Sequence, residues 1–215
     1  MLKAKGRGFL PDNSLIPEGC FCIEGRQFES EEELKTSKRY MKGGPRKYLY
    51  WKPDDVKAAI VTCGGLCPGI NVVIRELVMS LWYNYGVTDI YGIKFGYKGF
   101  TIDQCWERLT PDKVKNIHNT GGSILAMARG FLEESNSPDV SKYIVENIHK
   151  RGANIVFCIR GDGTHRGMNA LQEACKTLKY KIAFIGIPKT IDNDIAIIDK
   201  SFGFDSAVEI AQLAI

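Results

Sequence analysis

The chain has 215 residues, 44% of them hydrophobic and 25% charged, which is ordinary globular composition for one good core, or for one large domain and part of another. The net charge of +4 is a mild excess. The basic cluster between Lys35 and Lys47 is better explained as a solvated arm than as a nucleic-acid site, so no nucleic-acid partner is expected.

The cysteines and the apolar runs bear on the compartment. Seven cysteines, an odd number, do not form a disulfide framework in a chain of this size, and no apolar export signal follows Met1. No stretch reaches the roughly 18 uncharged apolar residues that a membrane span needs. We therefore expect a cytoplasmic protein without a membrane partner.

Residues 1–50 mix glycine, proline and charge, and they are expected to form an irregular N-terminal extension. The aromatic residues Tyr48, Tyr50 and Trp51 indicate that the end of this arm packs on the body. From Lys57 the pattern changes to alternating strands and helices, so residues 51–215 are expected to form one α/β domain.

Short apolar runs predict the strands, and 3.6-residue periodicity with capping residues predicts the helices. The expected strands cover residues 58–62, 90–95, 154–159 and 181–187, the last two as buried strands. The expected helices cover 71–83, a segment capped by Thr110 with Pro111 in first position, 137–151, 164–179 and 204–215. This alternation predicts a doubly wound, Rossmann-like parallel sheet between two helical layers, a three-layer α/β/α fold.

The segment from Pro188 to Asp194, Pro-Lys-Thr-Ile-Asp-Asn-Asp, follows the last predicted strand, where open α/β sheets bind ligands. If the segment is extended, Asp192 and Asp194 point the same way, so that one carboxylate raises the proton affinity of the other or both share a cation. A general base beside a phosphate would be built this way. The alternative is a polar loop that caps the next helix.

Four other loops carry residues suited to phosphate chemistry, at 62–71, 96–100, 121–130 and 160–164. Their glycines allow a close backbone approach to an anion, Arg129 offers planar cationic donors, and Asp162 suits Mg²⁺. Each alone could be an ordinary turn. Cys63 and Cys67 lack a second pair of ligands for zinc.

Because the carboxyl ends of parallel strands share one edge, several of these loops should converge there. A cation, a metal-binding carboxylate, phosphate-binding backbone and a carboxylate base together indicate phosphoryl transfer. A dinucleotide-binding dehydrogenase is disfavoured, because no Gly-x-Gly-x-x-Gly follows the first strand.

From Lys57 to the last residue the chain resembles the 6-phosphofructokinase family. Its motif sequences are most similar to those of the ATP-dependent plant and protist branch. The resemblance rests on six motifs in matching order and spacing: Cys63-Gly-Gly-Leu-Cys-Pro-Gly-Ile-Asn71, Gly96-Tyr-Lys-Gly-Phe100, Gly121-Gly-Ser123 with Arg129, Gly161-Asp-Gly-Thr164, Pro188 to Asp194, and Ser201-Phe-Gly-Phe-Asp205.

The resemblance implies phosphoryl transfer from ATP to the 1-hydroxyl of fructose 6-phosphate, a step of glycolysis. Asp192 would be the base, with Thr190, Asp194 and Arg129 also catalytic, and Asp162 would bind Mg²⁺. The implied donor-binding residues are Gly64, Tyr97, Arg129, Gly130, Gly161, Asp162, Gly163, Thr164 and Lys189. The resemblance also implies a homo-oligomer, a dimer or tetramer, with allosteric control.

Three features separate the alternatives within the family. Gly163 favours ATP, because pyrophosphate-using relatives typically carry aspartate there, whereas Lys189 occurs in both kinds of enzyme. Arg160 and Ala126 stand where the family usually has glycine, so the side chain of Arg160 either blocks the phosphate approach or adds charge to it. A catalytically silent subunit therefore stays open as a third hypothesis.

Family members extend well beyond Asp205 into a second domain that closes the cleft. We therefore expect this chain to be a fragment of a longer enzyme, with the second domain mostly missing.

Overall fold

The computed structural model describes residues 2–3, 15–17, 39–41, 48–128, 138–161, 165–195, 198 and 200–215. Four short strands belong to the first 50 residues: β1 (Leu2–Lys3) pairs antiparallel with β4 (Tyr48–Leu49), and β2 (Leu15–Pro17) pairs with β3 (Arg39–Met41). The sequence pattern did not predict these pairs.

A five-stranded sheet forms the centre of the molecule, in the order β7-β6-β5-β8-β9. Its strands are β5 (Lys57–Thr62), β6 (Asp89–Ile93), β7 (Trp106–Arg108), β8 (Ile155–Arg160) and β9 (Ala183–Pro188). Four strands are parallel, as expected. The fifth strand, β7, was not predicted; it is short and pairs antiparallel with β6 at the edge of the sheet.

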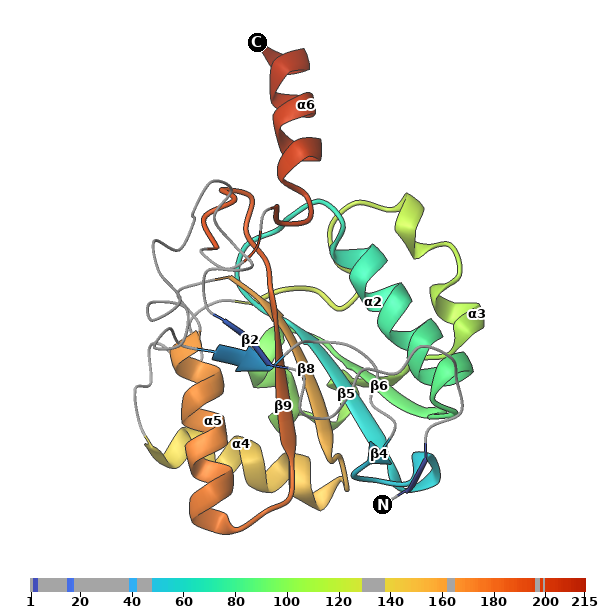
Figure 1. The fold of residues 1–215 in the computed structure, drawn as a ribbon, viewed down its shortest axis with the longest axis vertical. Helices are drawn as coiled ribbons and strands as arrows, with labels where there is room; N and C mark the ends of the chain where they lie inside the picture. Colours follow the sequence, from blue (N-terminus) through green and yellow to red (C-terminus); the bar gives the residue numbers. More distant parts are fainter. Residues whose placement is uncertain are drawn as a thin grey trace.

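Helices cover both faces of the sheet, so the predicted three layers are confirmed (Figure 1). The α-helices are α2 (Ile70–Met79), α3 (Pro111–Val114), α4 (Pro138–Lys150), α5 (His165–Leu178) and α6 (Phe204–Ala214). A π-helical turn, η2 (Ser80–Asn84), extends α2. Shorter 3₁₀ turns are η1 (Pro53–Asp55), η3 (Gly96–Thr101), η4 (Asp103–Cys105) and η5 (Ile117–Asn119).

Strand alternation divides the core into two clusters. Ala58 and Ile60 of β5 face α2, whereas Ala59 and Val61 face α4 and α5. All four side chains are fully buried, because β5 is the central strand and both of its faces are covered. The continuous apolar run at residues 58–61 is therefore the pattern of a strand buried on two sides.

The expectation of a buried strand at 181–187 is wrong in part. The strand forms as β9, but it lies at an edge of the sheet, and Ile185 is 39% exposed. The helix predicted from Thr110 also forms, with the threonine hydroxyl accepting a hydrogen bond from the Lys113 backbone N–H. It ends after four residues at Val114.

Helix α6 projects beyond the end of the sheet where the strands have their carboxyl ends (Figure 1). None of its residues is buried, and Ile210 and Leu213 are exposed. Within the described part of the chain, no helix combines the length and apolar character needed to cross a membrane.

Candidate active site

The predicted convergence of loops at one edge of the sheet is seen in a series of close approaches. A methyl group built on Gly64, after β5, would lie 3.9 Å from the backbone nitrogen of Gly161, after β8. A methyl group on Gly161 would in turn lie 3.2 Å from the carbonyl oxygen of Lys189, after β9. The backbone N–H of Lys189 donates to the carbonyl of Arg160 at 2.8 Å. Three strand ends therefore meet in one place.

The loops at 96–100 and 121–128 join the same edge through Ala128. Cys63 forms a parallel bridge with Ala128, and the Gly64 backbone N–H donates to the Ala128 carbonyl. A methyl group on Gly96 would lie 3.3 Å from that carbonyl oxygen. Positive φ explains glycine at positions 64 and 96, and the tight approach to Ala128 is a further reason at position 96.

Two buried polar side chains anchor the loop at 121–128. Asn71 in α2 donates to the Thr120 carbonyl at 2.8 Å and accepts from the Ile124 backbone N–H at 2.9 Å. Thr62 at the end of β5 donates to the Ala126 carbonyl at 2.9 Å and contacts the Ser123 hydroxyl. The sequence analysis did not single out Thr62 or Asn71. Their signal was a polar residue at the boundary of an apolar strand or helix segment, next to a glycine-rich loop.

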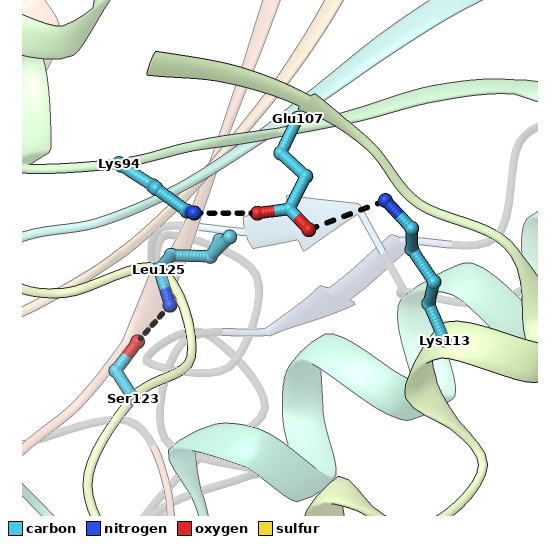
Figure 2. A network of polar contacts seen from close by, with 5 residues as sticks. All are labelled: Lys94, Glu107, Lys113, Ser123 and Leu125. Atoms are coloured by element: carbon cyan, nitrogen blue, oxygen red, sulfur yellow. Dashed lines mark hydrogen bonds and ion pairs between the residues drawn. The ribbon is translucent and has the colours of Figure 1, made fainter. Parts of the chain in front are cut away.

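Figure 2 shows two separate sets of polar contacts, an ion-pair network around Glu107 and a hydrogen bond within this loop. Glu107 of β7 bonds Lys94 at 2.7 Å and Lys113 of α3 at 3.2 Å, while the Leu125 backbone N–H donates to the Ser123 hydroxyl. The hydrogen bond from Lys94 lowers the pKa of Glu107, more than its partial burial raises it.

The segment from Lys189 to Asp194 bends, so the condition under which Asp192 and Asp194 would point the same way is not met. Asn193 has φ of 53°, in the left-handed region that asparagine tolerates. The Thr190 hydroxyl donates to the Asp194 carboxylate at 2.8 Å and accepts from the Asp192 backbone N–H at 3.0 Å. Thr190 is therefore the residue that orders both carboxylate-bearing positions.

Hydrogen bonds between residues further apart in the sequence hold this segment to the residues just before α6. The Ser201 hydroxyl donates to the Thr190 carbonyl at 3.0 Å, and the Ser201 backbone N–H donates to the Asn193 side chain at 2.7 Å. Gly203 has φ of 86°, and a methyl group there would lie 2.3 Å from the Pro68 carbonyl oxygen. Only glycine fits this position, where the start of α6 packs against the loop at 62–71.

The two carboxylates and their neighbours differ in exposure. Lys189 and Thr190 are buried at 6% and 8% exposure, whereas Asp192 and Asp194 are exposed. No hydrogen bond from another described residue occupies the Asp192 carboxylate. An exposed carboxylate on an ordered backbone, beside a buried cation, can accept a proton from a bound hydroxyl.

Tyr97 lies inside the fold and not on the surface of its loop. It is 5% exposed, and its hydroxyl accepts a hydrogen bond of 2.7 Å from Nη1 of Arg160. Burial, with Cys158 and Cys63 close by, raises the pKa of Tyr97 well above its usual range. Burial likewise raises the pKa of Cys158 from 9.0 to about 11, although Tyr97 and Arg160 oppose the shift.

Five predicted site residues, Arg129, Gly130, Asp162, Gly163 and Thr164, lie outside the described residues. The structure brings together Gly64, Gly161, Lys189 and the segment with Thr190, Asp192 and Asp194. Tyr97 is linked to them through Arg160, a residue that was expected either to block the phosphate approach or to add charge to it.

The possible metal ligands at this edge of the sheet are of the kind that Mg²⁺ binds. No group of three or more possible metal ligands occurs among the described side chains. Mg²⁺, however, usually binds one or two protein carboxylates together with substrate phosphates and water. The exposed Asp192 and Asp194 show that carboxylate oxygens are available at this edge.

Comparisons with known proteins agree with this arrangement. Residues 57–215 match the profile of the family described as Phosphofructokinase. The chain is 51% identical over 214 residues to ATP-dependent 6-phosphofructokinase 1 of Arabidopsis thaliana, covering 94% of this chain and 44% of that protein. It is 51% identical over 175 residues to the chloroplastic 6-phosphofructokinase 5 of the same plant, covering 81% of this chain and 31% of that protein.

The fold is also that of a solved relative. The structure of Pichia pastoris phosphofructokinase in the T-state matches with a TM-score of 0.64 and 22% identity, over 88% of this chain and 20% of that one. The chain thus spans less than half the length of these curated relatives. With a family profile that covers most of its residues, the chain belongs to the phosphofructokinase family.

Proposed function

We propose that this chain carries the phosphoryl-transfer edge of an ATP-dependent 6-phosphofructokinase. The observation that supports this most is the meeting of Gly64, Gly161 and buried Lys189 at the start of the segment that carries the exposed carboxylate of Asp192. Glycine backbone and a cation suit donor phosphates, and the carboxylate suits a reacting hydroxyl. The relatives compared above carry ATP-dependent 6-phosphofructokinase as their name.

In this proposal Asp192 accepts the proton of the 1-hydroxyl of fructose 6-phosphate. The freed oxygen forms a bond to the γ-phosphorus of ATP as the bond to the β–γ bridging oxygen breaks, giving fructose 1,6-bisphosphate and ADP. Thr190 orients the base through the Asp192 backbone N–H and holds Asp194. The role of these two hydrogen bonds of Thr190 is to keep the Asp192 and Asp194 carboxylates where sugar and phosphate meet.

The proposed binding site for the phosphoryl donor includes residues that lie outside the described part of the chain. Gly64, Gly161 and Lys189 line it, Tyr97 braces it, and Arg129, Gly130, Gly163 and Thr164 would complete it. Asp162 would hold Mg²⁺. When bound, the ion would neutralise charge on the phosphate oxygens.

The assignment of compartment, domains and assembly belongs to the same proposal. The family match begins at residue 57, which supports a boundary near residue 50 between the N-terminal extension and the α/β domain. A homo-oligomer under allosteric control, acting in glycolysis, follows from the family. We also propose a cytoplasmic location, although two relatives are named chloroplastic. Fluorescence microscopy of the tagged chain checks this.

A coupled assay with fructose 6-phosphate tests the proposed function against its rivals. Turnover with ATP, and none with pyrophosphate, is the expected result. Turnover with pyrophosphate alone would support the second candidate, a pyrophosphate-dependent enzyme, with which Lys189 is compatible. Turnover with neither donor would contradict both and support a silent subunit.

A further inference from the structure

Arg160 is a buried cation at the carboxyl end of β8. It is 1% exposed and has the largest of the fully buried side chains among the described residues. Alternation along β8 places it on the same face as Val156 and Cys158, which belong to the cluster under α4 and α5. The side chain therefore points into the fold and does not cover the glycine turn that follows it.

The guanidinium has only part of its hydrogen-bonding capacity satisfied. Nη1 donates to the Tyr97 hydroxyl at 2.7 Å, and the guanidinium lies 5.2 Å from the centre of the Tyr97 ring. Nε and Nη2 are both buried, and neither has a hydrogen-bond partner in the described part of the chain. Within that same part, Arg160 forms no ion pair with a carboxylate.

Such a side chain requires an anion. Arginine stays protonated in proteins, so Arg160 cannot lose its charge to escape burial. A buried charge with unpaired donors is costly, whereas a planar pair of N–H groups binds carboxylate or phosphate oxygens in a two-pronged geometry. A hydroxyl and an aromatic ring from Tyr97 do not neutralise the charge.

The position of Arg160 indicates which kind of anion would neutralise its charge. Its carbonyl accepts from Lys189, the next residue is Gly161, and a methyl group on Gly161 would lie 3.7 Å from the Lys189 ammonium nitrogen. The Lys189 ammonium thus lies beside the glycine turn, and the buried guanidinium of Arg160 belongs to the residue that precedes it. Phosphate oxygens are the anions that this pairing of cations and glycine backbone suits.

We propose that Arg160 is a donor-binding residue, whose Nε and Nη2 groups bond phosphate oxygens of the phosphoryl donor. This deepens the proposed function and rests on it for the identity of the donor. Tyr97 is then a positioning residue, because its hydroxyl holds Nη1 and leaves the other two groups directed elsewhere. The departure from glycine at this position adds a cation to the site without filling the turn.

Calorimetric titration with inorganic tripolyphosphate tests the proposal on the 215-residue chain. Arg160→Met keeps most of the side-chain volume without the charge, and it should weaken tripolyphosphate binding about 10- to 100-fold, the effect of losing charge-assisted hydrogen bonds. Arg160→Lys keeps a charge but not the planar donors and should weaken binding about 10-fold. The matched control, Arg108→Met at an exposed position of β7, should change the affinity less than about twofold.

A thermal melt separates binding from a purely structural role. Without ligand, Arg160→Met should melt at or above the wild-type temperature, because an uncompensated buried charge is removed. The rise in melting temperature produced by tripolyphosphate should shrink. If Arg160→Met does not fold, Arg160→Lys supplies the comparison.

Unchanged affinity in the folded variants, or no tripolyphosphate binding by the wild type, would overturn the proposal. An intramolecular carboxylate partner for Arg160 would give that result. Because tripolyphosphate has neither adenine nor sugar, the test is independent of turnover. Fructose 6-phosphate phosphorylation with unchanged tripolyphosphate affinity in Arg160→Met would contradict this inference alone. Tripolyphosphate binding that depends on Arg160, without turnover, would contradict the proposed function alone.

Discussion

The two sides of the candidate site are held in different ways. On the donor side, Gly64, Gly161 and Lys189 meet through contacts between strands that are far apart in the sequence, backed by fully or largely buried side chains. On the base side, Thr190 bonds residues two and four positions away, and Asp192 and Asp194 stay exposed. The donor side is thus part of the core, and the base side is a short ordered bend on its rim.

This contrast predicts that the two sides can be damaged separately. A change in the bend should affect chemistry without affecting stability, because few core contacts depend on it. A change in the anchors of the donor side should lower stability first. The following variants test the separation, from the largest expected effect to the smallest.

Asp192→Asn should lower kcat for fructose 6-phosphate phosphorylation by about 10²- to 10⁴-fold, the usual contribution of a general base. ATP affinity, measured by calorimetry, should change less than about twofold, because the donor side lies on other strands. Asp112→Asn is the matched control, since that carboxylate is 93% exposed in α3. Retained turnover in Asp192→Asn would show that another group takes the proton.

Asn71→Ala should lower the free energy of unfolding by about 2–3 kcal/mol. The change leaves the Thr120 carbonyl and the Ile124 N–H without the partner that anchors the loop. Urea unfolding measures the loss. Asn84→Ala, at an exposed asparagine bonded to Ser80, should cost less than about 0.5 kcal/mol, and equal losses would refute the anchoring role.

Stability should fall as pH rises from about 9 to about 11, in part through Cys158. Its pKa is raised from 9.0 to about 11 in the fold, so the unfolded chain releases the thiol proton first. The stabilisation is complete below the unfolded pKa and is lost as pH approaches the folded one. Wild type should therefore lose up to about 2 kcal/mol more than Cys158→Ala over this range, by urea unfolding. A constant difference between the two proteins would contradict the shift.

Ala126→Gly should raise the free energy of unfolding by about 1 kcal/mol. Ala126 has φ of 53°, a conformation in which a methyl group is strained and glycine is not. Ala128→Gly is the matched control, and there glycine should lower stability by about 0.5–1 kcal/mol, through the greater freedom of the unfolded chain. Thermal unfolding of both variants measures the difference, and a loss of stability in Ala126→Gly would argue against strain.

Much of the framework could be predicted because β5, β8 and α4 have patterns set by burial. The antiparallel β7 was missed because Trp106, Glu107 and Arg108 are few and mixed in polarity, and the pairing with β6 depends on tertiary contacts. The exposure of β9 could not be read from its apolar residues, since burial depends on what lies beside the strand.

The sequence predicted which loops contribute to the site but not how their residues are arranged. Strand order explains why the loops meet, but the bend at Asn193 also depends on the hydrogen bond that its side chain accepts from the Ser201 backbone N–H, and the local sequence does not predict that contact. The direction of Arg160, by contrast, was available from the alternation that places Cys158 inward on the same strand.

The central claim is that one edge of the sheet binds the phosphoryl donor, and an NMR titration of the chain with ATP tests it most directly. The amide signals of Gly64, Gly161 and Lys189 should shift together with a single dissociation constant. Those of Gly86 and Gly152, which precede β6 and β8 at the opposite end of the strands, should stay unchanged. Shifts at Gly86 and Gly152 without shifts at the first three residues would contradict the account.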